Sequence, residues 1–188
     1  KVVILCGGQG TRLREETEYR PKPMVQIGPR PILWHIMKGY AHHRFKDFVL
    51  CLGYKGEMIK EWFFDYELLT SDATITLGKD RKVELHRREA IDDWRVTLAD
   101  TGQDALTGAR VKKVARYLDG ERFMLTYGDG VCDVDLGKLL EFHVAHGKIG
   151  TVTGVHPGAR FGELKLAGKR VTGFSEKPQV VDSYINGG

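Results

Sequence analysis

The 188-residue sequence is poor in cysteine and contains no long apolar run, no low-complexity segment and no repeat. Its three cysteines are Cys6, Cys51 and Cys132, an odd number, and two of them lie in short apolar segments. A secreted domain stabilised by disulfides would carry more cysteines, in pairs. We therefore expect reduced thiols and a cytoplasmic protein.

The sequence also lacks the features of membrane and nucleic-acid-binding proteins. The opening apolar run, residues 2–6, is too short for the core of a signal peptide and for a membrane span. The formal net charge is +4, and the Lys and Arg residues do not form the clustered stripe of a nucleic-acid binder. We therefore expect the protein to bind neither a membrane nor a nucleic acid. Its mild basicity suits small anionic substrates.

What is present is typical of a globular domain, with 41% hydrophobic and 29% charged residues in a length that fits one domain, 1–188. Apolar runs alternate with amphipathic stretches, which predicts an α/β fold with a doubly wound parallel sheet. Three short alternating segments predict a small β excursion beside that sheet. The expected strands are 2–5, 48–52, 123–127, 149–155 and 171–177, the expected helices are 31–43, 57–66, 111–118 with Thr107 as a possible N-cap, and 136–146, and the excursion covers 73–77, 83–86 and 96–98.

Glycines follow the first expected strand directly, at Gly7, Gly8 and Gly10. Without Cβ atoms, backbone N–H groups at a strand end can point at a polyphosphate. Arg12 adds a cation and Thr11 a hydroxyl. The spacing matches neither a P-loop, which needs a lysine after the second glycine, nor a dinucleotide fingerprint. The stretch predicts a phosphate cradle, with a plain glycine-rich turn as the alternative.

Lys22 stands between Pro21 and Pro23, which we expect to hold it in an extended backbone. A lysine directed back toward the glycines can neutralise phosphate charge. The alternative is a solvated surface lysine.

Asp129 lies between Gly128 and Gly130 at the end of an expected strand. Its hard carboxylate oxygens suit Mg²⁺, with room for water and phosphate oxygens. Because Asp-Gly is also a common turn pair, an ordinary turn is the alternative. His35 and its neighbours lack carboxylate or thiol partners at ligand spacing, so we expect surface or packing roles for them.

Four blocks in order resemble the sugar nucleotidyltransferases, the NDP-sugar pyrophosphorylases, over essentially the whole chain. Within the family, further segments are most similar to the branch that uses CTP and glucose 1-phosphate. The four blocks are G-G-x-G-T-R-L with P-K-P at 7–23, Gly128-Asp129, Phe174-x-Glu176-Lys177-Pro178 and Asn186-Gly187-Gly188, and the further segments are 31–37, 53–56, 100–110 and 126–131.

The resemblance implies a Rossmann-like three-layer core with a mostly parallel sheet. It also implies Mg²⁺-dependent transfer of CMP from CTP to α-D-glucose 1-phosphate, which gives CDP-glucose and pyrophosphate. Two alternatives stay open: a uridylyl- or thymidylyltransferase acting on a sugar 1-phosphate, and a non-catalytic regulatory homologue. Arg12, Lys22, Asp129 and Lys177 argue against the regulatory homologue, since such domains tend to lose these charges.

The resemblance assigns roles to individual residues. Arg12, Lys22 and Asp129 would be catalytic, with Asp129 on the Mg²⁺. The nucleotide would be held by Leu5, Gly7, Gly8, Gln9, Gly10, Thr11, Arg12, Lys22, Thr107, Arg110 and Gly128, and the sugar phosphate by Gly162, Glu176, Lys177 and Asn186.

The sequence departs from the family pattern at Ala109, where a second glycine is usual, and this change would narrow the base-reading loop. Family members also continue for roughly a third more chain. The continuation holds a second aspartate for the metal and helices that help assemble oligomers. The resemblance therefore implies a homo-oligomer whose C-terminal part is not among these 188 residues.

Overall fold

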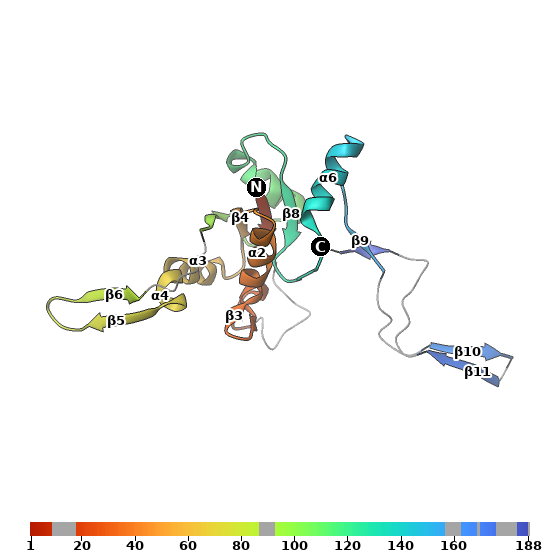
Figure 1. Ribbon diagram of the computed structural model, residues 1–188, viewed down its shortest axis with the longest axis horizontal. Coiled ribbons are helices and arrows are strands. Elements are labelled where there is room, and N and C mark those ends of the chain that lie inside the picture. Colours follow the sequence, from red (N-terminus) through yellow and green to blue (C-terminus); the bar gives the residue numbers. More distant parts are fainter. Residues whose placement is uncertain (9–17, 87–92, 157–162, 169, 176–183, 188) are drawn as a thin grey trace. The chain divides into compact units, whose positions relative to one another are not determined.

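The computed structural model describes residues 1–8, 18–86, 93–156, 163–168, 170–175 and 184–187 (Figure 1). The chain divides into two compact units, 1–136 and 137–188. Whether they form the single domain expected above stays a prediction. Within the described part, no helix has the length and apolar character that a membrane crossing requires.

A four-stranded parallel sheet in the order β7-β4-β1-β8 forms the centre of the first unit. Its strands are β1 (Val2–Leu5), β4 (Asp47–Leu52), β7 (Arg95–Asp100) and β8 (Met124–Tyr127). The apolar β1 and β4 are internal, as their composition predicts for strands covered on both faces. All three strand pairs are in parallel register, with Leu5 opposite both Cys51 and Tyr127.

Two apolar clusters cover the two faces of this sheet. On one face, Ile4, Phe48 and Leu50 pack with residues of α2 (Ile32–His42) and α3 (Gly56–Phe64). On the other, Val49 and Cys51 pack with Val114 of α5 (Thr107–Val114) and with Leu118. Since alternate strand residues point to opposite faces, helices on both sides make three layers. The Rossmann-like three-layer architecture is confirmed.

The small β excursion is only partly as expected. β5 (Asp72–Thr76) and β6 (Lys82–His86) form a separate antiparallel hairpin. The third segment was wrongly placed in it, because residues 95–100 form β7, which pairs in parallel with β4. An edge strand is half exposed and shows an alternating pattern, so its sequence resembles that of a hairpin strand.

Several local expectations are also corrected. Lys22 lies in a 3₁₀ turn, η1 (Lys22–Met24), not in extended backbone; only Pro21 before it is extended. Thr107 is not a side-chain N-cap: the cap residue is Leu106, and α5 begins at Thr107 itself. β8 is half exposed, since in this unit it is the other edge of the sheet.

The remaining elements lie outside the central sheet and its covering helices. They are β2 (Gln26–Ile27), β3 (Arg30–Pro31), α4 (Tyr66–Thr70) and η2 (Ala115–Tyr117) in the first unit, and α6 (Leu136–His146), β9 (Gly154–Val155), β10 (Glu163–Ala167), β11 (Arg170–Ser175) and β12 (Ile185–Asn186) at and beyond its end. The strand expected at 149–155 is reduced to β9, which pairs with β12. β11 confirms the strand expected at 171–177 as far as Ser175, whereas its antiparallel partner β10 was not indicated by the sequence pattern.

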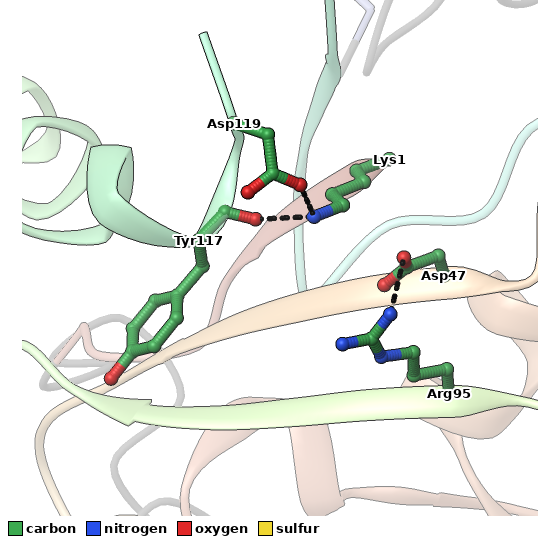
Figure 2. A network of polar contacts seen from close by, with 5 residues as sticks. All are labelled: Lys1, Asp47, Arg95, Tyr117 and Asp119. Atoms are coloured by element: carbon green, nitrogen blue, oxygen red, sulfur yellow. Dashed lines mark hydrogen bonds and ion pairs between the residues drawn. The ribbon is translucent and has the colours of Figure 1, made fainter. Parts of the chain in front are cut away.

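Polar contacts join the sheet to its connections at the amino ends of the strands (Figure 2). Lys1 Nζ donates to the Tyr117 carbonyl, at 2.7 Å, and to the Asp119 carboxylate. This hydrogen bond lowers the pKa of Asp119 below its usual range. Arg95 Nη1 lies 3.9 Å from Asp47 Oδ2. The opposite ends of the same strands carry the candidate site.

Candidate active site

The carboxyl ends of the four parallel strands meet at one edge of the sheet. The N–H of Gly128, just after β8, donates to the Leu5 carbonyl at 3.0 Å, and the N–H of Cys6 donates to the Cys51 carbonyl at 3.0 Å. The N–H of Thr101, after β7, donates to the Leu52 carbonyl at 3.0 Å. Ligands of open α/β sheets bind at such strand ends. The residues that follow the strands are thus brought together here.

Lys22 and Asp129 form an ion pair at this edge. Lys22 Nζ donates to Asp129 Oδ2 at 3.1 Å, across 107 residues of sequence. The side chains of Lys22 and Asp129 are 23% and 41% exposed, so solvent and a ligand can reach both. The pair places a cation and a carboxylate side by side beside the glycine stretch.

The position of Lys22 depends on close packing between its neighbour Pro23 and the end of β8. Pro23 is buried, and a Cβ at Gly128 would lie 2.9 Å from its Cγ and 3.0 Å from the Leu5 carbonyl oxygen. Such distances leave no room for a larger residue than glycine at 128. Gly128 therefore lets the 3₁₀ turn approach the strand end and bring Lys22 to Asp129.

Arg110 lies beneath the same edge and is buried, with 5% of its surface exposed. It comes from the first turn of α5, and its guanidinium bonds to three strand ends. Nη2 donates to the carbonyls of Gly7 at 2.9 Å and Gln103 at 3.0 Å, and Nη1 donates to the Leu52 carbonyl at 3.1 Å, Thr101 Oγ1 at 2.7 Å and the Gly102 carbonyl at 2.9 Å.

Two glycines make room for this guanidinium. A Cβ at Gly7 would lie 2.0 Å from Arg110 Nη1 and 2.3 Å from Cζ. A Cβ at Gly53 would lie 2.7 Å from Nη1 and 2.8 Å from the Gly7 carbonyl oxygen. By contrast, a Cβ at Gly8 would meet nothing within 4 Å. Gly7 is thus required by the packing of Arg110 against the backbone, whereas the space beside Gly8 is open.

These groups surround a pocket of about 230 Å³. Seven of the residues assigned from sequence line it: Leu5, Gly7, Gly8, Lys22, Thr107, Arg110 and Asp129. Sequence reasoning missed five more: Cys6, Pro23, Ala105, Leu106 and Tyr127. The sequence offered one indication of these five residues: each lies within two positions of a residue that was assigned to the site.

Two further assigned residues, Gly128 and Asn186, lie in the part of the chain that the structure describes. Gly128 supports the pocket from the end of β8 without lining it. Asn186 lies in β12 of the second unit. Gln9, Gly10, Thr11, Arg12, Gly162, Glu176 and Lys177 lie outside the residues that the structure describes.

The thiols at the site are kept protonated by burial. Burial raises the pKa of Cys6 strongly, and the nearby Cys51 and Asp129 raise it further, although Arg110 opposes this. Burial raises the pKa of Cys51 to about 11, again opposed by Arg110. Thiols with such pKa values are poor nucleophiles at neutral pH. The pocket is therefore suited to positioning and charge stabilisation and not to thiolate chemistry.

Asp129 is the carboxylate that could take a metal ion here. Among the described residues, no three His, Cys, Asp or Glu side chains are grouped to hold one. Mg²⁺, however, is commonly bound through one or two carboxylates together with substrate phosphates. The side chains therefore fit an ion that arrives with a polyphosphate better than one held by protein alone.

Comparison with known proteins shows the family to which the chain belongs. The family model described as Nucleotidyl transferase matches residues 1–188. Glucose-1-phosphate cytidylyltransferase of Salmonella typhimurium is 51% identical over 189 residues, covering 100% of this chain and 73% of that protein. Mannose-1-phosphate guanylyltransferase catalytic subunit beta of Dictyostelium discoideum is 30% identical over 199 residues, covering 100% of this chain and 48% of that protein.

A solved structure, HddC from Yersinia pseudotuberculosis complexed with GMP-PN, superposes with a TM-score of 0.61 at 24% identity. The superposition covers 99% of this chain and 73% of the HddC chain, and it shows that the two share a fold. The match of the family model over every residue and the 51% identity over the full chain show the family directly. The chain belongs to the nucleotidyl transferase family.

Proposed function

We propose that the protein transfers CMP from CTP to α-D-glucose 1-phosphate, giving CDP-glucose and pyrophosphate. The observation that carries the proposal is the Lys22–Asp129 pair on the pocket beside Gly7 and Gly8, in a chain 51% identical to a glucose-1-phosphate cytidylyltransferase. A cation, a carboxylate and a glycine-rich strand end are the groups that bind a triphosphate and stabilise its transfer.

The reaction needs no nucleophilic side chain. An oxygen of the sugar phosphate attacks the α-phosphorus of CTP in line, the new P–O bond forms, and pyrophosphate leaves with the electron pair of the bond that breaks. The protein has to bring two anions together and stabilise the charge that develops. The raised pKa values of Cys6 and Cys51 agree with a reaction that uses no thiolate nucleophile.

Each described residue has a role in the proposal. The N–H groups near Gly7 and Gly8 would hold phosphate oxygens. Lys22 would leave Asp129 and neutralise the α-phosphate, while Asp129 would hold Mg²⁺ together with the nucleotide. Bound Mg²⁺ supplies charge neutralisation on the phosphate oxygens. Thr107 and the start of α5 would face the cytosine.

The other assignments remain predictions of the family resemblance. They are a direct nucleotide contact from Arg110, the roles of Gln9, Gly10, Thr11 and Arg12 on the nucleotide, and the roles of Gly162, Glu176, Lys177 and Asn186 on the sugar phosphate. A homo-oligomeric state and a cytoplasmic location also remain predictions.

The test compares CTP, UTP, TTP, GTP and ATP with glucose 1-phosphate and Mg²⁺, following pyrophosphate release and nucleotide binding in parallel. We expect a preference for CTP in both measurements. Equal use of all five would contradict the choice of base, and a preference for UTP or TTP would favour the alternative branches.

The matched control uses a second lysine–aspartate pair. Lys46 Nζ lies 2.7 Å from Asp93 Oδ1, on the surface and away from the pocket residues. Lys22→Met and Asp129→Asn should abolish pyrophosphate release, whereas Lys46→Met and Asp93→Asn should leave it near the unmodified level. Equal effects in the two pairs would show that Lys22 and Asp129 have no special part in the reaction.

A further inference from the structure

We propose that Lys55 is a positioning residue, which anchors the segment ahead of Lys22 to the turn after β4 and so keeps the Lys22 ammonium group at the pocket. The inference rests on the proposed function, since the part of Lys22 on the phosphate is assigned there. It gives Lys55 an indirect part: its own ammonium group contacts the backbone at Glu18, and Lys22 contacts the nucleotide.

Lys55 lies in the turn between β4 and α3, at a position where a side chain is strained. The turn runs from Gly53 to Gly56, and the N–H of Gly56 donates to the Gly53 carbonyl at 3.0 Å. Lys55 is its third residue, with φ +50° and ψ +35°, in the left-handed region. Turns with a positive φ at the third residue ordinarily carry glycine or asparagine there, because a Cβ atom crowds the following carbonyl. The backbone therefore favours a residue other than lysine.

Lys55 is also an unfavourable cap for the helix that follows. It is the N-cap residue of α3, and its side chain makes no cap hydrogen bond. Serine, threonine, aspartate and asparagine are the usual caps, and a cation beside the first N–H groups of a helix opposes the helix dipole. Strain without a local benefit points to a part for the side chain elsewhere.

The side chain of Lys55 reaches a segment that is distant in the sequence. Lys55 Nζ donates to the Glu18 carbonyl at 2.5 Å, across 37 residues, and lies 5.5 Å from the centroid of the Tyr54 ring. In the same turn, the Tyr54 N–H donates to the Gly7 carbonyl at 3.4 Å. The turn after β4 therefore contacts both the glycine stretch and the segment that leads to Lys22.

Glu18 and Pro23 mark the two ends of the short segment that carries Lys22. Pro23 is buried against the end of β8, and the contact with Lys55 holds the other end. Pro21 and Pro23 each fix φ, so the backbone between the two ends has few conformations. When both ends are held, the place from which the Lys22 side chain enters the pocket is held too. Lys55 thus positions Lys22 through the backbone.

The first experiment compares reaction rate with stability. Lys55→Gly removes the anchoring ammonium group together with the strain at this position. We expect kcat for pyrophosphate release to fall by about tenfold, as it does when a catalytic group is misplaced, while the urea midpoint does not fall. Lys55→Arg keeps a cation there and should retain more of the rate. A joint loss of rate and midpoint in Lys55→Gly would show a purely structural role and overturn the proposal.

Arg44 provides the matched control. It also has a positive φ, 69°, and it is exposed between α2 and the amino end of β4, whereas the pocket lies at the carboxyl ends of the strands. Arg44→Gly should raise the urea midpoint by about 0.3 M, because strain is removed, and leave kcat unchanged. If Arg44→Gly slows the reaction as much as Lys55→Gly does, the loss is not specific to Lys55 and the proposal fails.

The second experiment separates positioning from direct contact by measuring CTP affinity. Lys55→Gly should weaken CTP binding in the unmodified protein and should weaken it no further in a Lys22→Met background, because Lys55 acts through Lys22. An equal loss in both backgrounds would show that Lys55 acts on the nucleotide independently of Lys22, and it would overturn the proposal.

The third experiment needs no nucleotide. In the free protein, Lys55→Gly should raise amide hydrogen exchange at residues 19–25 and leave exchange in β1 unchanged. If the unmodified protein binds no nucleotide, the proposed function fails, but this measurement still decides whether Lys55 holds the segment that carries Lys22. Unaltered exchange at residues 19–25 would overturn the inference.

Discussion

Gly7→Ala should be far more destabilising than Gly8→Ala, although the two glycines are adjacent. A Cβ at position 7 would lie 2.0 Å from Arg110 Nη1 and 2.8 Å from Nη2. Since non-bonded heavy atoms prefer about 3.5 Å, the guanidinium has to move by roughly 1.5 Å. Its bonds to the Gly7 carbonyl and Thr101 Oγ1, now 2.9 and 2.7 Å, cannot survive such a displacement.

The loss can be estimated from those bonds. A hydrogen bond to a charged group contributes about 1.5–3 kcal/mol net. If two are lost and water replaces part of them, we expect the free energy of unfolding to fall by about 3 kcal/mol. Gly8→Ala has open space around its Cβ and should change stability by less than about 0.5 kcal/mol.

Urea denaturation followed by circular dichroism measures the difference, provided that the dependence on urea is the same in each variant. Combining the substitutions then isolates the cause. In an Arg110→Ala background Gly7→Ala should cost much less, with a coupling of about 2 kcal/mol. Gly53→Ala should keep a larger part of its cost there, because its Cβ also lies 2.8 Å from the Gly7 carbonyl oxygen. Equal costs for positions 7 and 8 would refute the reasoning.

Three further predictions concern the thiols and the core. Ellman's reagent at neutral pH should react at once with Cys132, which is exposed, and with the buried Cys6 and Cys51 only after denaturation; three fast thiols would contradict the structure. Because burial raises the pKa of Cys51 from 9.0 to about 11, the unfolded chain loses this proton first. The free energy of unfolding should therefore fall between these pH values, by up to about 1.4 kcal/mol per pH unit from this group, and the fall should lessen in Cys51→Ala. Phe48→Ala should cost about 3–5 kcal/mol in urea denaturation, since Phe48 is fully buried, whereas Phe64→Ala, at 90% exposure, should cost less than about 0.5 kcal/mol.

Much of the fold could be predicted because its central strands are simple. Residues 2–5 and 48–52 are continuous apolar runs, and both lie inside the sheet as such runs indicate. The convergence of Gly7, Lys22 and Asp129 could be anticipated too, since parallel strands bring their carboxyl ends to one edge. The structure places all three on one pocket.

The errors arise where the sequence pattern does not distinguish two structures. Residues 95–100 alternate like a hairpin strand because an edge strand of a parallel sheet is also half exposed. The prolines around Lys22 are compatible with a 3₁₀ turn as well as with extended backbone, because proline fixes φ but not ψ.

The buried position of Arg110 could not be read from its own segment. Thr107-Gly108-Ala109-Arg110 is polar and small, and arginine is among the residues most often exposed. The available signal lay elsewhere, in Gly7 and Gly53, whose missing Cβ atoms leave the space that the guanidinium occupies. This signal can be interpreted only once the fold is known, because Gly7, Gly53 and Arg110 lie in three segments that are distant in the sequence.

The Lys22–Asp129 pair has a consequence for how the proposed site would bind its substrate. Lys22 Nζ has to leave Asp129 Oδ2 before it can meet a phosphate. The side chains are 23% and 41% exposed, and ion pairs of this kind contribute at most about 1 kcal/mol, because solvent screens them. Breaking the pair thus opposes binding only weakly, whereas a triphosphate offers Lys22 a more highly charged partner. Meanwhile the pair keeps cation and carboxylate at the pocket in the free protein. Lys22 and Asp129 are therefore held in position by an interaction weak enough for the substrate to replace.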